Sequence, residues 1–192
     1  VSGDGNVVAV GGLFLNPYHI KVYQRNSGDT FGLRYTIGSE QSTGSSVALN
    51  SDGSLLAVAI YGHGSTGKVQ VYKWMTDHYA LQQSFIGLAN YHHMGGVHLT
   101  NAQSLHSGYP PQHDLMSFGG APGEELLCVT ESNWPQPGLY GMVRMFEANT
   151  GTELPSLAGG NNSEYGRAVS LSNDGKVVII GAPEFHRVYT YD

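Results

Sequence analysis

Histidine side chains gather in one short part of the sequence, between residues 91 and 114. Five of the nine histidines lie there, and a carboxylate follows the last of them. These residues are His92, His93, His98, His106, His113 and Asp114. Imidazole nitrogens and carboxylate oxygens are common ligands of zinc and other transition metals. The composition predicts a metal site as one hypothesis. A polar surface loop rich in histidine is the alternative, because no pair has a defined ligand spacing.

Aromatic side chains near the histidines could bind a partner. Tyr109 and Phe118 lie in a stretch rich in Pro and Gly, residues 104–123, which we expect to be a long insertion between two strands. Trp134 and Tyr140 lie in a second loop. Exposed aromatic residues recognise sugar rings and partner proteins. We expect a recognition surface here for a protein or a glycan; the alternatives are a neutral loop expansion and a Trp134 that packs between blades.

Groups that could act in catalysis are few. Cys128 lies in the apolar run ELLCVTE, which indicates a buried packing residue and not a nucleophile. The paired carboxylates Glu124-Glu125 precede that run, and no nucleophile elbow, phosphate-binding loop or dinucleotide fingerprint is present. We therefore expect no enzyme. An enzyme with a metal near the histidine-rich segment is kept as an alternative.

Composition excludes several classes of protein. The net charge is −6, only 12% of residues are charged, and no basic run exists, so a nucleic-acid partner is not expected. No apolar stretch approaches the roughly 20 residues of a transmembrane helix. The lone cysteine excludes an internal disulfide, which leaves the compartment open. The 27 glycines and 12 tyrosines favour many short strands joined by tight turns.

Those strands belong to a repeated unit marked by Asp-Gly pairs. Asp4, Asp52 and Asp174 each precede a glycine, and the first two lie 48 residues apart. A degraded copy fits the longer gap if Val97 and Leu99 are aligned with Val47 and Leu49, so that Ala102-Gln103 replaces Asp-Gly. Four units at this period are typical of solenoids and propellers.

Apolar residues alternate within each unit, which predicts strands and no helix. The continuous apolar runs LLAVA and VVIIG indicate strands buried on both faces, and Asp-Gly between strands predicts a type I′ hairpin turn. A unit of four antiparallel strands repeated in this way is a propeller blade. We therefore expect an all-β chain, a single partial β-propeller over residues 1–192, with approximate blades at 1–40, 41–88, 89–160 and 161–192.

The last unit resembles an FG-GAP repeat, the blade of integrin-α-type propellers. Tyr165-Gly166 stands at the FG position, Gly181-Ala182-Pro183 is the GAP, and RVYTY is the closing strand. The resemblance is strong in this unit, fair in the first two and poor in the third. It implies an extracellular or cell-surface module that presents loops to a protein or glycan. WD40 repeats share the Asp-Gly hairpin, but their terminal Trp-Asp and Gly-His are absent.

Many FG-GAP repeats also bind calcium through acidic hairpin loops, and this sequence departs from that pattern. The residues at the corresponding positions are Asp4, Asn50, Asp52 and Asp174, which gives one carboxylate per loop. Calcium takes six to eight oxygen ligands, several of them from carboxylates. Turn chemistry explains the Asp-Gly pairs adequately, so we expect no cofactor, with calcium as the alternative.

The sequence thus favours a non-enzymatic binding or structural module outside the cell, with a scaffold subunit that has no ligand of its own as the alternative. Asn161 begins an N-glycosylation sequon, which matters only if the protein is secreted. Counting strands gives three, four, four and three in successive units. We therefore expect this chain to be a fragment, with further blades of the same parent chain as its neighbours.

Overall fold

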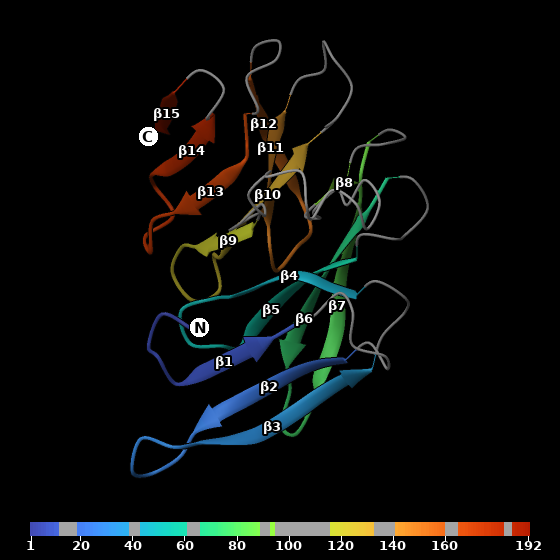
Figure 1. Ribbon diagram of the computed structural model, residues 1–192, viewed down its shortest axis with the longest axis vertical. Coiled ribbons are helices and arrows are strands. Elements are labelled where there is room, and N and C mark those ends of the chain that lie inside the picture. The colour runs from blue at the N-terminus through green and yellow to red at the C-terminus, as the bar shows by residue number, and fades with distance from the viewer. Residues whose placement is uncertain are drawn as a thin grey trace, which may run out of the picture.

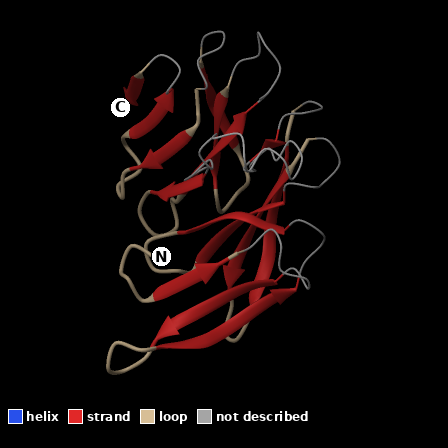
Figure 2. Ribbon diagram, in the orientation of Figure 1, coloured by secondary structure: helices blue, strands red, loops and turns tan. Residues whose placement is uncertain are grey.

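A computed structural model of the chain describes residues 1–11, 19–38, 43–60, 66–88, 93–94, 116–132, 141–159, 165–182 and 186–192. Within these ranges the regular structure consists of strands, and no helix occurs (Figure 2). The strands form four antiparallel sheets that follow one another along the chain. No helix in the described part of the chain is long and apolar enough to cross a membrane.

The first two sheets are simple meanders in which strands adjacent in sequence pair with each other. The first, blade 1, contains β1 (Val7–Val10), β2 (His19–Arg25) and β3 (Phe31–Gly38). The second, blade 2, contains β4 (Thr43–Leu49), β5 (Leu55–Ile60), β6 (Lys68–Trp74) and β7 (Tyr79–Ile86).

The third and fourth sheets follow the same order with one irregularity. Blade 3 contains β8 (His93–Met94), β9 (Met116–Gly119), β10 (Leu126–Ser132), β11 (Met142–Glu147) and β12 (Glu153–Ala158). Blade 4 contains β13 (Ala168–Leu171), β14 (Val178–Ala182) and β15 (Arg187–Tyr191). In blade 3 both β8 and β9 pair with β10, so two separate segments together occupy the place of the first strand.

Blade 1 lies at the lower end of the view in Figure 1 with blade 2 above it, and blades 3 and 4 lie beside each other in the upper part. The first strands of neighbouring blades contact each other, since β4 touches β1 and β9, and β9 touches β13. Blades 2 and 3 therefore each bury one sheet face against the blade before them and the other against the blade after them. This is the arrangement of blades in a β-propeller.

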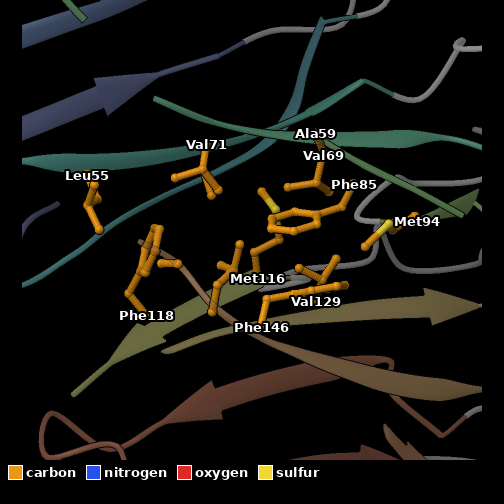
Figure 3. Packing of buried hydrophobic residues seen from close by; sticks show 13 residues of the cluster. Leu55, Ala59, Val69, Val71, Phe85, Met94, Met116, Phe118, Val129 and Phe146 are labelled. Atoms are coloured by element: carbon orange, nitrogen blue, oxygen red, sulfur yellow. The ribbon is translucent and has the colours of Figure 1, made fainter. Parts of the chain in front are cut away.

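Three apolar clusters fill the spaces between the four blades. Strand β5 shows why its sequence is apolar throughout: Leu55, Ala57 and Ala59 face blade 3, whereas Leu56 and Val58 face blade 1. Side chains alternate between the faces of a strand, so a strand between two sheets needs apolar residues at every position. Figure 3 shows the blade 2–blade 3 cluster, where the rings of Phe85 and Phe146 stack with centroids 4.0 Å apart.

The Asp-Gly turns are not the predicted type I′ turns. Only the glycines have positive φ, for example +71° at Gly53, and the preceding aspartates do not. The N–H of Gly53 donates to the carbonyl of Asn50, and the backbone pairing closes between Asn50 and Leu55. The loop between them is therefore four residues long and built around a turn.

The predicted alignment of the third unit is also wrong. The hairpin of blade 3 joins β9 to β10 through residues 120–125, with Gly119 paired to Leu126, and so does not lie at Ala102-Gln103. Part of the insertion expected at residues 104–123 is thus a paired strand. Met94 and Met116, which flank residues outside the description, pair with Glu131 and Val129 of the same strand, β10.

Candidate interaction surface

A hydrogen-bonded hairpin recurs at one edge of blades 1, 2 and 4. Its first residue, Ser or Asn, accepts the backbone N–H of the residue five positions later. The three bonds, each 2.9 Å, run from Val7 N to Ser2 Oγ, from Leu55 N to Asn50 Oδ1, and from Val177 N to Ser172 Oγ. These side chains replace one backbone bond of each hairpin and fix the loop to the strand that follows.

The aspartate of each loop is bound inside its own hairpin. Asp4 accepts the Ser2 hydroxyl at 2.6 Å and the Asn6 N–H at 2.9 Å, and both bonds lower the pKa of its carboxyl. The Ser172 hydroxyl and the Lys176 N–H lower the pKa of Asp174 in the same way.

Asp52 lies in the corresponding loop of blade 2. Partial burial opposes the shift there, but hydrogen bonds from Ser54 still lower the pKa of Asp52. The candidate calcium residue Asn50 is buried, with both ends of its amide engaged, by Leu55 on one side and by Ser54 and Glu125 on the other. These bonds hold the polar side chains within the hairpins, although the turn itself is not the type I′ turn predicted from the sequence.

Blade 3 lacks this hairpin motif, and Glu125 replaces it. The Glu125 carboxylate is buried and accepts three N–H groups: from Gly123 at 2.9 Å, from the Asn149 amide at 2.6 Å and from the Asn50 amide at 3.2 Å. Glu125 therefore bonds to three hairpin loops: the β9–β10 and β11–β12 loops of blade 3 and the β4–β5 loop of blade 2. A buried carboxylate whose oxygens accept several donors stabilises the structure around it.

A cleft of about 980 Å³ opens between these hairpins at the shared edge of blades 2, 3 and 4. Its lining consists of Ser51, residues 120–126, Glu147, Asn149, Thr150 and residues 173–176. Glu124, Glu147 and Asp174 contribute carboxylates to it, and Lys176 contributes one positive charge. The cleft has short, hydrogen-bonded hairpins on its walls, so its shape is set by the fold.

A second polar junction joins blades 2 and 3 at the other end of the strands. Arg144 of β11 donates to Glu131 at 3.3 Å, to both oxygens of Glu153 at 2.7 and 2.8 Å, and to the carbonyl of Ile86 at 2.9 Å. Glu131 is fully buried and also accepts the N–H of Leu88 at 2.6 Å. Burial alone would lower the pKa of Arg144, but Glu153 and Glu131 raise it above its usual value.

Sequence reasoning missed the Glu131–Arg144 junction, although one signal for it exists. The positions that correspond to Glu131 in blades 2 and 4 are Ile60 and Ala182, which are both buried and apolar. A glutamate at a core position needs a charged or hydrogen-bonding partner. That partner comes from a different strand and was not identifiable from spacing along the chain.

Of the four aromatic residues predicted to bind a partner, only Phe118 lies in the described part of the chain. Phe118 is buried in the cluster between blades 2 and 3, so it belongs to the core and not to an exposed recognition surface. Tyr109, Trp134 and Tyr140 lie outside the described residues. Cys128 is buried as expected, and burial raises the pKa of its thiol to about 12.

The predicted metal ligands mostly fall outside the described part of the chain. His93 contributes backbone pairing to β8, and the structure does not describe the positions of His92, His98, His106, His113 and Asp114. Asn161, the sequon residue, also lies outside the described ranges. Among the residues that the structure describes, no three His, Cys, Asp or Glu side chains gather in a way that could hold a metal ion.

Comparison with known proteins identifies the fold. No protein-family model matches the sequence, and no curated protein matches it. The chain is similar to the β-propeller domain of Cps50 (Swd1) from Myceliophteria thermophila, with a TM-score of 0.62 and 12% sequence identity. The match covers 100% of this chain and 51% of that one. The four sheets are therefore blades of a β-propeller, and the chain spans about half the length of that propeller chain.

Proposed function

We propose that this chain is a scaffold without catalytic activity, which holds neighbouring proteins of an assembly on a rigid row of blades. The proposal rests on the observation that the buried polar side chains form hydrogen bonds between neighbouring blades. Glu125, Glu131 and Arg144 all bond one blade to the next. Such bonds fix the blades relative to each other, which is what a presenting surface requires.

The cleft at the hairpin edge is the surface that we assign to a partner. Four carboxylates, the buried Glu125 among them, and one lysine line it, so its charge is complementary to a loop or peptide that carries Lys or Arg. Its volume of about 980 Å³ accommodates several side chains. The partner proposed for this surface is thus a cationic segment of a neighbouring protein.

NMR titration of the ¹⁵N-labelled chain tests this assignment. The probes are a lysine-rich peptide and a glutamate-rich peptide of equal length. The lysine-rich peptide is expected to shift the amide signals of residues 120–126 and 173–176, and the shifts should weaken as salt is added. The glutamate-rich peptide should leave them unchanged.

A pair of charge-reversal variants provides the control. Glu124→Lys places the change in the cleft, whereas Asp77→Lys makes the same change of charge in the exposed β6–β7 hairpin, outside the cleft lining. Only Glu124→Lys should weaken binding of the lysine-rich peptide. Equal loss in both variants would show that general charge, and not the cleft, attracts the peptide.

An enzyme with a metal near the histidine-rich segment is the second function to be tested. Metal analysis of the purified chain separates it from a scaffold: a stoichiometric transition metal would favour the enzyme. The finer features implied by the FG-GAP resemblance stay predictions. These are the extracellular location, glycan binding, glycosylation at Asn161 and calcium in the hairpins.

The resemblance itself gains a physical explanation in the last blade. Gly166, at the FG position, has a φ of +84° and donates its N–H to the carbonyl of Gly181, at the GAP position, over 3.0 Å. The two glycines therefore meet across the start of the blade. Any propeller with this entry to a blade would favour such glycines, so the pair supports the blade more strongly than it supports one repeat family.

A further inference from the structure

The Asp-Gly pairs of the hairpins have a reaction of their own as well as a role in the turns. In such a pair the amide nitrogen of the glycine can attack Cγ of the aspartate side chain. An N–C bond forms, a C–O bond of the carboxyl breaks, and water leaves as a succinimide ring closes. Water then opens the ring at either carbonyl, which restores aspartate or gives isoaspartate. Glycine favours the attack because it has no Cβ in the way.

The hairpin of blade 4 keeps the two reacting groups of Asp174 and Gly175 apart while it is closed. The N–H of Gly175 donates to the carbonyl of Ser172 at 2.9 Å. The Asp174 carboxylate accepts the Ser172 hydroxyl at 2.6 Å and the Lys176 N–H at 3.2 Å. Both bonds lower the pKa of this carboxyl, and an ionised carboxyl is a poor target for the attack. The reaction therefore requires the hairpin to open locally.

The blade 4 hairpin lies at the cleft and is only lightly packed. Asp174 and Lys176 are exposed, Gly175 is half-buried, and all three line the cleft. Blade 3 contacts this hairpin through the backbone of Gly120, which donates its N–H to the carbonyl of Asn173 at 3.0 Å. A Cβ built on Gly175 would lie 3.0 Å from the Cα of Gly120, which has no side chain to pack there. A backbone contact of this kind restrains the loop less than packed side chains would.

The hairpin of blade 2 has the same bonds in a different environment. The N–H of Gly53 donates to the carbonyl of the first hairpin residue at 3.3 Å, and Asp52 accepts the Ser54 N–H at 2.9 Å. Gly53 is buried, however, and its carbonyl accepts the Tyr79 hydroxyl at 2.6 Å. A Cβ built on Gly53 would lie 2.5 Å from the Val7 side chain. Opening this hairpin therefore disturbs the apolar cluster between blades 1 and 2, to which Val7 and Tyr79 belong.

We propose that Asp174-Gly175 is a site of spontaneous modification, where isoaspartate accumulates on the wall of the cleft, and that packing spares Asp52-Gly53. Each opening of the blade 4 hairpin frees the Gly175 nitrogen and the Asp174 carboxyl together, so the rate of conversion follows the open population. Ser172 limits that population, because its hydroxyl also accepts the Val177 N–H at 2.9 Å. Ser172 is thus a protecting residue for the pair that follows it.

Isoaspartate at residue 174 changes the shape of the cleft. The charge stays negative, but the main chain gains one methylene group, so the loop between Ser172 and Val177 no longer fits its hydrogen bonds. The cleft of a modified chain therefore loses affinity for a cationic segment. This consequence rests on the proposed function of the cleft, whereas the modification itself does not.

Ageing of the folded chain tests the proposal. The chain is kept at near-neutral pH for several weeks and digested, and its peptides are separated by liquid chromatography. An isoaspartyl peptide has an unchanged mass and a different retention time, and protein isoaspartyl methyltransferase labels it with a methyl group. We expect isoaspartate at residue 174 to exceed that at residue 52 by about tenfold or more, because conversion follows local opening.

The same chain unfolded in guanidinium chloride is the matched control. Both aspartates precede glycine, so without the fold the two sites should convert at similar rates, each faster than in the folded chain. The same excess at residue 174 in the unfolded chain would overturn the proposal, since the neighbouring sequence and not the packing would then set the rates.

Two substitutions should change the two sites separately. Ser172→Ala removes the hydroxyl that holds the Asp174 carboxylate, and it should speed conversion at residue 174 about tenfold and leave residue 52 unchanged. Ser172→Thr keeps the hydroxyl and should restore the slow rate. Tyr79→Phe removes the bond to the Gly53 carbonyl and should speed conversion at residue 52 alone. Asp174→Glu closes the ring poorly and should remove the signal at residue 174. Circular dichroism establishes that each variant is folded.

Equal conversion at the two sites of the folded chain would overturn the proposal, as would a folded chain that forms isoaspartate at neither. A rate at residue 174 that Ser172→Ala leaves unchanged would contradict the role given to Ser172. The effect on the cleft is measured separately, by titrating the lysine-rich peptide into fresh and aged chain. Failure of the fresh chain to bind would contradict the proposed function and leave the modification standing. Equal binding by both would contradict the effect on the cleft.

Discussion

The packing interface between two neighbouring blades is called a joint below. The joint between blades 1 and 2 differs from the joint between blades 2 and 3. In the first, apolar side chains pack together and the Arg34 guanidinium lies 3.7 Å from the ring centroid of Trp74. The second has an apolar cluster too, but adds buried charges, with Arg144 and Glu131 reaching across to β7 and the segment that follows it. Blades 1 and 2 keep the repeated hairpin, whereas blade 3 has lost it.

The difference indicates how a repeat protein tolerates an irregular unit. In a regular joint, the hairpin bonds and alternating apolar residues suffice to hold the blades. In blade 3 the first strand is split and the hairpin motif is absent. Side-chain hydrogen bonds connect it to blade 2 instead, from Asn50 to Glu125 and from Arg144 to the carbonyl of Ile86. Buried charges of this kind are costly to break, because the remaining partner has no water to solvate it.

Arg144→Ala should therefore produce the largest loss of stability. Removal of the guanidinium leaves the buried Glu131 carboxylate unpaired, so the free energy of unfolding should fall by about 3–5 kcal/mol. Arg34→Ala, the matched change in the apolar joint, should cost about 1 kcal/mol, since a partly exposed cation–π contact is worth little more. Urea unfolding curves measure both. Equal losses would show that the two joints do not differ in this way.

Two glycine-to-alanine substitutions compare Gly53, which lies in a joint between blades, with Gly28, which lies away from any joint. Gly53 and Gly28 both have positive φ, so alanine costs about 1–2 kcal/mol at each. A Cβ at Gly53 would also lie 2.5 Å from Val7 Cγ2 in blade 1, whereas nothing lies within 4 Å at Gly28. Overpacking should make Gly53→Ala about 1–3 kcal/mol worse than Gly28→Ala. Thermal unfolding that shifted equally in both variants would mean that the joint is loose.

Part of the dependence of stability on pH should arise in the hairpins of the regular blades. Asp4 and Asp174 have pKa values lowered in the folded state from the ordinary value of 3.8. Their contribution is complete above about pH 4 and is lost as the pH falls through the lower folded pKa. Asp4→Asn should therefore make the unfolding free energy less steep below pH 4 and leave its slope at pH 6–7 unaltered. Blade 3 has Pro122 at the corresponding loop and contributes no such aspartate. If the slope of the unfolding free energy against pH below pH 4 is the same in Asp4→Asn and in the unaltered chain, the acid sensitivity arises from groups other than Asp4.

Sequence patterns predicted the regular part of the fold well. The apolar run LLAVA lies in β5 and the run RVYTY coincides with β15, because strand patterning and Asp-Gly turns are local signals. The propeller fold class followed from their repetition. The geometry of the turns was not predicted from these patterns. The four-residue loop depends on side-chain hydrogen bonds, such as the one from Leu55 N to Asn50 Oδ1.

Blade 3 could not be predicted in the same way. Val97 and Leu99 have the alternation of a strand, whereas β9 reads MSFG and its hairpin has no Asp-Gly. β9 pairs with β10 across residues 120–125, and no Asp-Gly pair in the sequence marks that loop as a hairpin. Glu125 was visible only as one of two adjacent carboxylates before a strand, and its partner Asn50 lies 75 residues away.

The central claim is that a neighbouring blade buries the apolar residues of the strand that follows the Asp-Gly hairpin, and the most direct test uses two valines. Val58 and Val10 occupy the same place in blades 2 and 1, each six residues after the Asp of its hairpin, and only Val58 has a described blade packed on it. Val58→Ala should lower the unfolding free energy by about 2 kcal/mol, from the lost methyl groups and the cavity. Val10→Ala should change it by less than about 0.5 kcal/mol. Equal losses at the two positions would contradict the account.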